Sequence, residues 1–269
     1  MIASFLISCN KINYFPDVAI EEVETQIIAH RTGGNNHFQE NSLKGATYSL
    51  GIVDGIEVDL QISKDGTLWL EHDVDLGSCG GNVYKCFPEA TDNEIVDLDS
   101  CNANDFNYTR LEELFSFVFL NYPNAHVALD VKSWKICGTN SGFSLKKMNE
   151  IGDEIIRLTK KYEMQNQVMV ESETATFLTY IKNNSSGIDY YLTAFGDFER
   201  GMRIALEKGY TGIAFKYNFD EDITSEHIQL LRKKGLKIQL WTLVSDEELS
   251  EAIKINPDFI QTENLEYFQ

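Results

Sequence analysis

The stretch GIEVDLQISKDGTLWLEHD, residues 55–73, places two acids one residue apart in an otherwise apolar run and ends on His-Asp. Glu57 and Asp59 would share one face of the strand that this run predicts, because alternate side chains of a β-strand point to the same side. The opposite face is wholly apolar. Two carboxylates at a spacing of roughly 6.5 Å either face water or hold something positive.

Strand and helix patterns alternate along the chain from about residue 25 to its end. SKDG is a turn that leaves no room for a helix, so the stretch 55–73 forms a hairpin. One arm of this hairpin is a strand beyond the eight that a barrel needs. The remaining alternation favours a (β/α)8 TIM barrel over an open sheet. The expected strands are 25–29, 55–61, 67–71, 126–131, 168–171, 190–193, 211–215, 237–243 and 258–261. The expected helices are 41–51, 110–121, 144–162, 174–184, 197–208, 222–234 and 245–254.

Residues 74–109 interrupt this rhythm with frequent Gly, Cys, Asn and Asp. We expect a small inserted loop region at the catalytic mouth of the barrel, too short to bury a core of its own. Residues 25–269 then form one barrel domain, and residues 1–24 form an N-terminal extension.

The net charge of the chain restricts the kinds of molecule that it can bind. The chain has 23 basic and 42 acidic residues, for a formal charge of −19. Such a field repels phosphate backbones and argues against nucleic-acid binding. An anionic substrate would need local positive charge or a metal ion. No apolar run approaches the length of about 20 residues that crosses a bilayer.

The N-terminal sequence MIASFLISC resembles a bacterial lipobox ending at Cys9. Lipidation of Cys9 would make the extension a lipoprotein signal remnant, with peripheral membrane association and a location in the cell envelope or periplasm. The alternative is an unanchored terminus or a start codon assigned too late, with a cytoplasmic location. In an exported protein Cys79 and Cys86 could close the loop CGGNVYKC as a disulfide, whereas in the cytosol they would be free thiols, like Cys101 and Cys137.

Chemically active side chains fall at the carboxyl ends of four successive strands, where TIM barrels place their active sites. Taken singly, each set has a structural explanation: a solvated strand face, hydrogen-bonded histidines or an interior ion pair. Their coincidence at one mouth favours a functional site. The residues are His30, Arg31, Glu57, Asp59, His72, Asp73, Asp130 and Lys132.

Three carboxylates at one site would repel one another without a cation among them, and all-oxygen ligation selects Mg²⁺ or Ca²⁺ over zinc. With Arg31 and Lys132 nearby, this site would be a positive spot suited to a phosphate group. Two histidines beside it can act as base and acid, because their pKa values lie near working pH.

These motifs resemble the glycerophosphodiester phosphodiesterase family. The run AHR…ENSLKGA…GIEVDLQISKDGTLWLEHD is similar to the family signature HRG…PENT…IExDVxxTKDGxxVxxHD. ALDVK is similar to its later E-x-K strand, and QLWTL and FIQTEN are similar to its W-T and T-D endings. The resemblance covers residues 25 to about 264.

The resemblance implies metal-dependent hydrolysis of glycerophosphodiesters to an alcohol and sn-glycerol 3-phosphate. It makes His30 and His72 the acid/base pair. It makes Glu57, Asp59 and Asp130 the ligands of one Mg²⁺ or Ca²⁺ ion. Arg31 and Lys132 would bind the phosphate, and Trp241 would line the substrate cleft.

The chain departs from the family pattern at several positions. Thr32 replaces the glycine of HRG, which alters a turn beside the phosphate and could shift substrate choice. Gln39 replaces the proline of PENT, and Asp130 replaces a glutamate, which shortens one metal ligand by a methylene. Glu173 adds charge where an apolar contact is usual. None of these changes removes a catalytic group.

Three alternatives remain open. The same barrel could act as a lysophospholipase D or a phospholipase C-like enzyme, although residues 74–109 show no apolar channel. It could bind ligands without turnover, which the presence of both histidines opposes. A glycosidase pair of carboxylates would leave the histidines unexplained.

Overall fold

The computed structural model describes residues 23–33, 38–76, 85–99, 107–132, 145–217 and 223–269. Within them, eight parallel strands form a closed barrel, because β1 pairs with both β10 and β2. The predicted TIM barrel is therefore confirmed. The barrel strands are β1 (Gln26–Ala29), β2 (Gly55–Ile62), β5 (His126–Asp130), β6 (Val168–Ser172), β7 (Asp189–Ala194), β8 (Gly212–Lys216), β9 (Lys237–Leu243) and β10 (Phe259–Thr262).

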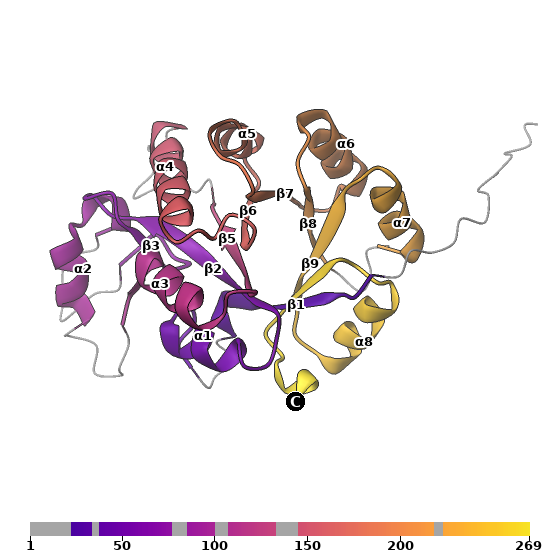
Figure 1. Cartoon of the computed structure of the whole chain (residues 1–269), viewed down its shortest axis with the longest axis horizontal. Coiled ribbons are helices and arrows are strands. Elements are labelled where there is room, and N and C mark those ends of the chain that lie inside the picture. The colour runs from indigo at the N-terminus through magenta and orange to yellow at the C-terminus, as the bar shows by residue number, and fades with distance from the viewer. Residues whose placement is uncertain (1–22, 34–37, 77–84, 100–106, 133–144, 218–222) are drawn as a thin grey trace, which may run out of the picture.

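Helices surround the strands, and the main hydrophobic core lies between the two layers (Figure 1). Each predicted helix is present, with ends that differ by no more than three residues from those expected. The helices are α1 (Leu43–Ser49), α2 (Asp92–Asp99), α3 (Leu111–Asn121), α4 (Leu145–Lys161), α5 (Ala175–Asn184), α6 (Phe198–Lys208), α7 (Ser225–Lys233) and α8 (Asp246–Lys254). No helix in the described ranges is both long and apolar enough to span a bilayer.

Local sequence signals explain several of these helix ends. The Ser42 hydroxyl accepts a hydrogen bond from the Gly45 N–H and begins α1. Ser245 and Glu248 form a capping box at the start of α8. Gly209 ends α6 in a left-handed conformation that glycine adopts without strain.

The predicted hairpin is also present. β3 (Leu68–Leu70) turns back antiparallel to β2 and then pairs with a two-residue strand, β4 (Thr109–Arg110). The sequence predicted neither β4 nor α2, both of which lie in or beside the inserted segment 74–109. β4 is too short for a periodic pattern, and α2 is short and rich in acids.

The inserted segment packs a small hydrophobic cluster against Trp69 of β3, which lies outside the segment. The Trp69 indole donates a hydrogen bond to Asp92, and the Arg110 guanidinium lies 4.6 Å from its ring centre. In Figure 1, α2 lies at the outer edge of the molecule beyond β3. The cluster comprises Trp69, Leu76, Phe87, Ala90, Ile95 and Tyr108.

Several sequence predictions concern residues outside the described ranges. These are the lipidation of Cys9 and the states of Cys79, Cys101 and Cys137. Cys86 is disulfide-bonded, but because Cys79 is not among the described residues, their pairing remains a prediction.

Candidate active site

The carboxyl ends of the barrel strands surround a cavity of about 590 Å³. Side chains from all eight barrel strands, or from the residue directly after a strand, line it. The cavity therefore lies where TIM-barrel enzymes place their active sites. None of the described residues of segment 74–109 lines it.

The lining follows from the alternation of side chains along the strands. An apolar layer closes the barrel interior with Ile28, Ala128, Met169, Tyr191, Ala214 and Phe259. The residues two positions further along these strands line the cavity: His30, Asp130, Glu171, Thr193, Lys216 and Gln261. Because alternate side chains share a face, each strand presents first an apolar and then a polar group to the barrel interior.

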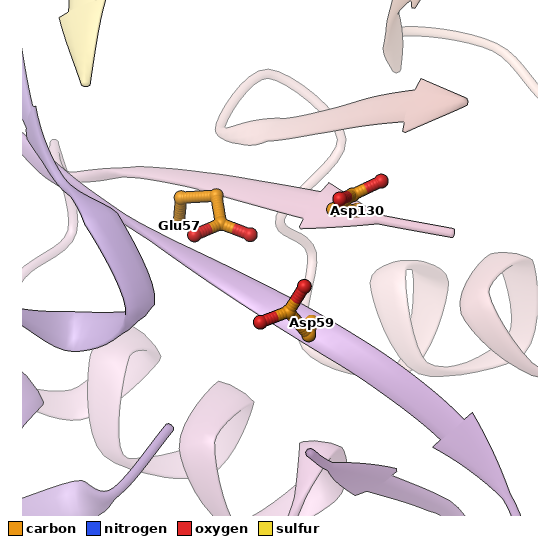
Figure 2. A group of neighbouring side chains, drawn as sticks. All are labelled: Glu57, Asp59 and Asp130. Carbon is orange, nitrogen blue, oxygen red and sulfur yellow. The ribbon is translucent and has the colours of Figure 1, made fainter. Parts of the chain in front are cut away.

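Glu57 and Asp59 belong to this inward face. Both are buried, at 2% exposure each, so a solvated strand face does not explain them. Asp130 joins them from β5, which pairs with β2 so that Asp130 lies opposite Asp59. One oxygen from each of the three carboxylates lies within 4.8 Å of the others (Figure 2).

The electrostatics of this cluster indicate a shortage of positive charge. Burial raises the pKa of Glu57 well above its usual range, and the charges of Asp59 and Asp130 raise it further. Burial also raises the pKa of Asp130, to about 6, although Lys132 opposes the shift. Two buried carboxylates and the partly exposed Asp130 supply only oxygen donors, which is the ligand set of a hard divalent cation. The cluster therefore fits a divalent cation.

The two predicted phosphate-binding cations contact the same cluster. Lys132 donates a hydrogen bond to Asp59 and lies 3.3 Å from an Asp130 oxygen. The Arg31 Nε atom lies 3.2 Å from Asp59 Oδ2, while its backbone N–H donates to Glu57. Burial tends to raise the pKa of Asp59, but the Lys132 and Arg31 charges outweigh it, and the pKa falls below its usual range.

Each predicted catalytic histidine is hydrogen-bonded to a carboxylate through Nδ1. His30 Nδ1 lies 3.0 Å from Glu263 Oε1, and His30 Nε2 lies 3.8 Å from Glu57 Oε2. His72 Nδ1 lies 2.8 Å from Asp73 Oδ1. In both pairs the ring N–H donates, because an ionised carboxylate only accepts. Both histidines line the cavity.

The turn after β1 shows why the family has glycine where this chain has Thr32. Arg31, Thr32 and Gly33 all have positive φ angles, of 49°, 62° and 73°. The Thr32 side chain is fully buried and accepts a hydrogen bond from the Ser42 N–H, so it points away from the cavity. Thr32 therefore makes no contact with the cavity that would support the expected effect on substrate choice.

Asn41 is an additional residue that holds the acidic cluster. Its side chain donates to Asp59 Oδ2 and accepts from the Asp59 N–H. It adopts a left-handed φ of 53°, which asparagine tolerates better than most residues. The E-N pair of the signature thus has a structural role here.

The sequence reasoning assigned no role to Glu171 and Glu263. Glu171 lines the cavity and accepts hydrogen bonds from the amides of Gln239 and Gln261. Burial and the charge of Asp130 raise its pKa to about 8. Its position, two residues after Met169 in a Val-rich strand, is the signal that would have placed it inside the barrel.

Two aromatic side chains, from β9 and from the end of β7, also line the cavity. Trp241 lines the cavity, as predicted, and Phe195 packs edge-on against it with 5.6 Å between ring centres. Glu173, where the family has an apolar residue, also lines the cavity, and so does Lys216.

The chain is similar to known proteins over most of its length. A model of the glycerophosphoryl diester phosphodiesterase family matches residues 30–266. A glycerophosphodiester phosphodiesterase of Caldanaerobacter subterraneus is 26% identical over 251 residues, which cover 91% of this chain and 96% of the relative.

Solved structures share the fold. A glycerophosphodiester phosphodiesterase from Thermotoga maritima has a TM-score of 0.70 at 22% identity, covering 91% of this chain and 97% of that one. A phosphodiesterase from Oleispira antarctica, in complex with the product sn-glycerol-3-phosphate, has a TM-score of 0.71 at 16% identity, covering 90% and 93%.

Proposed function

The chain belongs to the glycerophosphoryl diester phosphodiesterase family, and from that premise we propose that it hydrolyses glycerophosphodiesters to an alcohol and sn-glycerol 3-phosphate. The observation that carries the proposal is the convergence of two histidines and two cations on one cavity, beside a cluster of three carboxylates of which two line that cavity. The product named for the Oleispira structure supports the same substrate class.

Glu57, Asp59 and Asp130 would hold one divalent cation, Mg²⁺ or Ca²⁺. The bound ion would neutralise negative charge on the phosphoryl oxygens. Arg31 and Lys132 would bind the phosphate, because both cations already lie against this cluster. Trp241 would pack against the substrate.

His30 and His72 would divide the proton transfers. One histidine removes the proton from the glycerol 2-hydroxyl as that oxygen attacks phosphorus. The other donates a proton to the alcohol oxygen as its bond to phosphorus breaks. Water then opens the resulting cyclic phosphate, with the two histidines in reversed roles. General acid–base steps of this kind contribute about 10²- to 10⁴-fold each.

Lysophospholipids are a second candidate substrate class, favoured by Phe195. This side chain lines the cavity and is 57% exposed beside Trp241, which gives an acyl or other apolar substituent a surface to contact. The reaction would then be that of a lysophospholipase D. The sequence of residues 74–109 predicts no apolar channel, whereas this exposed aromatic surface lies at the end of β7.

The test is release of sn-glycerol 3-phosphate from glycerophosphocholine and glycerophosphoethanolamine, with and without EDTA. We expect release that requires both a divalent ion and His72, so His72→Ala should lose at least about 10²-fold in kcat. His227→Ala is the matched control, because His227 lies on α7 and does not line the cavity. Absence of release with metal present would refute the proposal, and lysophosphatidylcholine would be assayed next.

We also propose membrane anchoring through lipidated Cys9, on the evidence of the lipobox-like sequence alone. Fractionation of producing bacterial cells tests it. The wild-type chain should sediment with membranes and Cys9→Ala should not. Equal distribution of the two chains would contradict the anchor.

A further inference from the structure

His30 and Glu263 meet at the seam where the barrel closes. They are 233 residues apart in the chain, but parallel pairing of β1 with β10 aligns Ala29 with Thr262, and His30 and Glu263 directly follow. The seam thus places a carboxylate from the end of the chain against a histidine from its beginning.

The contact between them is specific. His30 Nδ1 donates to Glu263 Oε1 over 3.0 Å, and the Glu263 backbone N–H is fixed by the Leu243 carbonyl at 3.2 Å. The His72–Asp73 pair differs, because its members are adjacent in sequence and the Asp73 side chain is 73% exposed. Glu263 is half as exposed, at 37%, so solvent competes less for its hydrogen bond.

The hydrogen bond to Glu263 determines which ring nitrogen of His30 carries the proton and which is left to act as an acceptor. With the proton on Nδ1 held by Glu263, the lone pair of His30 is on Nε2, the atom that lies 3.8 Å from Glu57 Oε2. Without the carboxylate, the ring could take either tautomer and could rotate about its side-chain bonds.

We propose that Glu263 is a positioning residue for the reaction, which holds His30 in one tautomer and one orientation with Nε2 toward the substrate. This inference rests on the proposed function, because it assumes that His30 transfers a proton. Nothing in the contact requires Glu263 itself to touch the substrate, and it does not line the cavity.

Kinetics of Glu263→Gln give the first test. We expect kcat to fall by about 10- to 10²-fold with KM changed by less than about threefold, since orientation of a general acid or base acts on the transition state. Glu266→Gln is the matched control, because it removes an exposed carboxylate three residues further along. The control should retain wild-type kcat.

A double-mutant cycle separates positioning from structural damage. If Glu263 acts through His30, Glu263→Gln should cause no further loss in a His30→Ala background, whereas damage elsewhere would add to it. Nitrogen-15 NMR of labelled histidines should show one His30 tautomer in the wild type and a mixture in Glu263→Gln, with His30→Ala assigning the signals.

The two proposals fail differently. Full activity of His30→Ala would overturn the two-histidine mechanism itself. Inactive His30→Ala together with wild-type kcat and an unchanged His30 spectrum in Glu263→Gln would overturn the role of Glu263 alone. Additive losses in the cycle would also overturn it.

Discussion

Replacement of Glu171 by glutamine should stabilise the metal-free protein at neutral and alkaline pH. Glu171 is buried among barrel side chains, and burial followed by the charge of Asp130 raises its pKa from 4.5 to about 8. In the unfolded chain its pKa is ordinary. Between these two pKa values the folded protein keeps the proton that the unfolded chain releases.

The sign of the effect follows from this difference. The contribution of Glu171 to stability is complete below about pH 4.5 and is lost as the pH rises toward about 8. Each displaced pKa unit corresponds to about 1.4 kcal/mol, so three units between pH 5 and pH 8 give a ceiling of about 4 kcal/mol. Structural relaxation and water entry reduce such values, so we expect a gain of about 2–4 kcal/mol for Glu171→Gln across this range.

Glutamine preserves the local hydrogen bonding. Its carbonyl oxygen can accept from the Gln239 and Gln261 amides as the carboxylate does. Gln239 Oε1 is buried with no hydrogen-bond partner among the described atoms, so an added N–H donor has an acceptor nearby. The substitution thus removes the proton equilibrium with little change of shape.

Urea unfolding in EDTA at pH 5, 6, 7 and 8 measures the effect. The difference in unfolding free energy between Glu171→Gln and wild type should increase steadily with pH. Glu173→Gln, at the exposed residue directly after the same strand, is the control, because its carboxylate has little burial to relieve. A difference for Glu171→Gln that is constant from pH 5 to pH 8 would refute the reasoning.

Other substitutions test the turn and the acidic cluster. Thr32→Gly should lower stability by about 1 kcal/mol without changing KM, because relief of a left-handed φ is outweighed by loss of the acceptor for the buried Ser42 N–H. Thermal unfolding and substrate titration check this, and a raised KM would contradict it. Asn41→Ala should weaken divalent-ion binding about 10- to 100-fold by calorimetry, because both bonds to Asp59 are lost. Unchanged affinity would show that Asn41 does not hold the ligand. Mg²⁺ or Ca²⁺ should raise the melting temperature of the wild type but not of Asp130→Asn, and an equal rise in both would remove Asp130 from the site.

Much of the fold and part of the site could be predicted from local patterns. The alternation in residues 55–62 placed Glu57 and Asp59 on one face, and the βα rhythm predicted the barrel and its active end. Both signals are local, because a strand of period two and a helix of period 3.6 repeat within a few residues. The failures, β4 and α2, are elements too short or too acidic to show a period.

Tertiary structure decided what the acids and histidines contact. Closure of the barrel brings Glu263 to His30 across 233 residues, and the register of β2 with β5 brings Asp130 opposite Asp59. Burial, which depends on every surrounding strand, sets the pKa of Glu171. The sequence by itself determined which side chains point into the barrel. Only the closed structure determined their distances and charges, because these depend on neighbours that are remote in the chain.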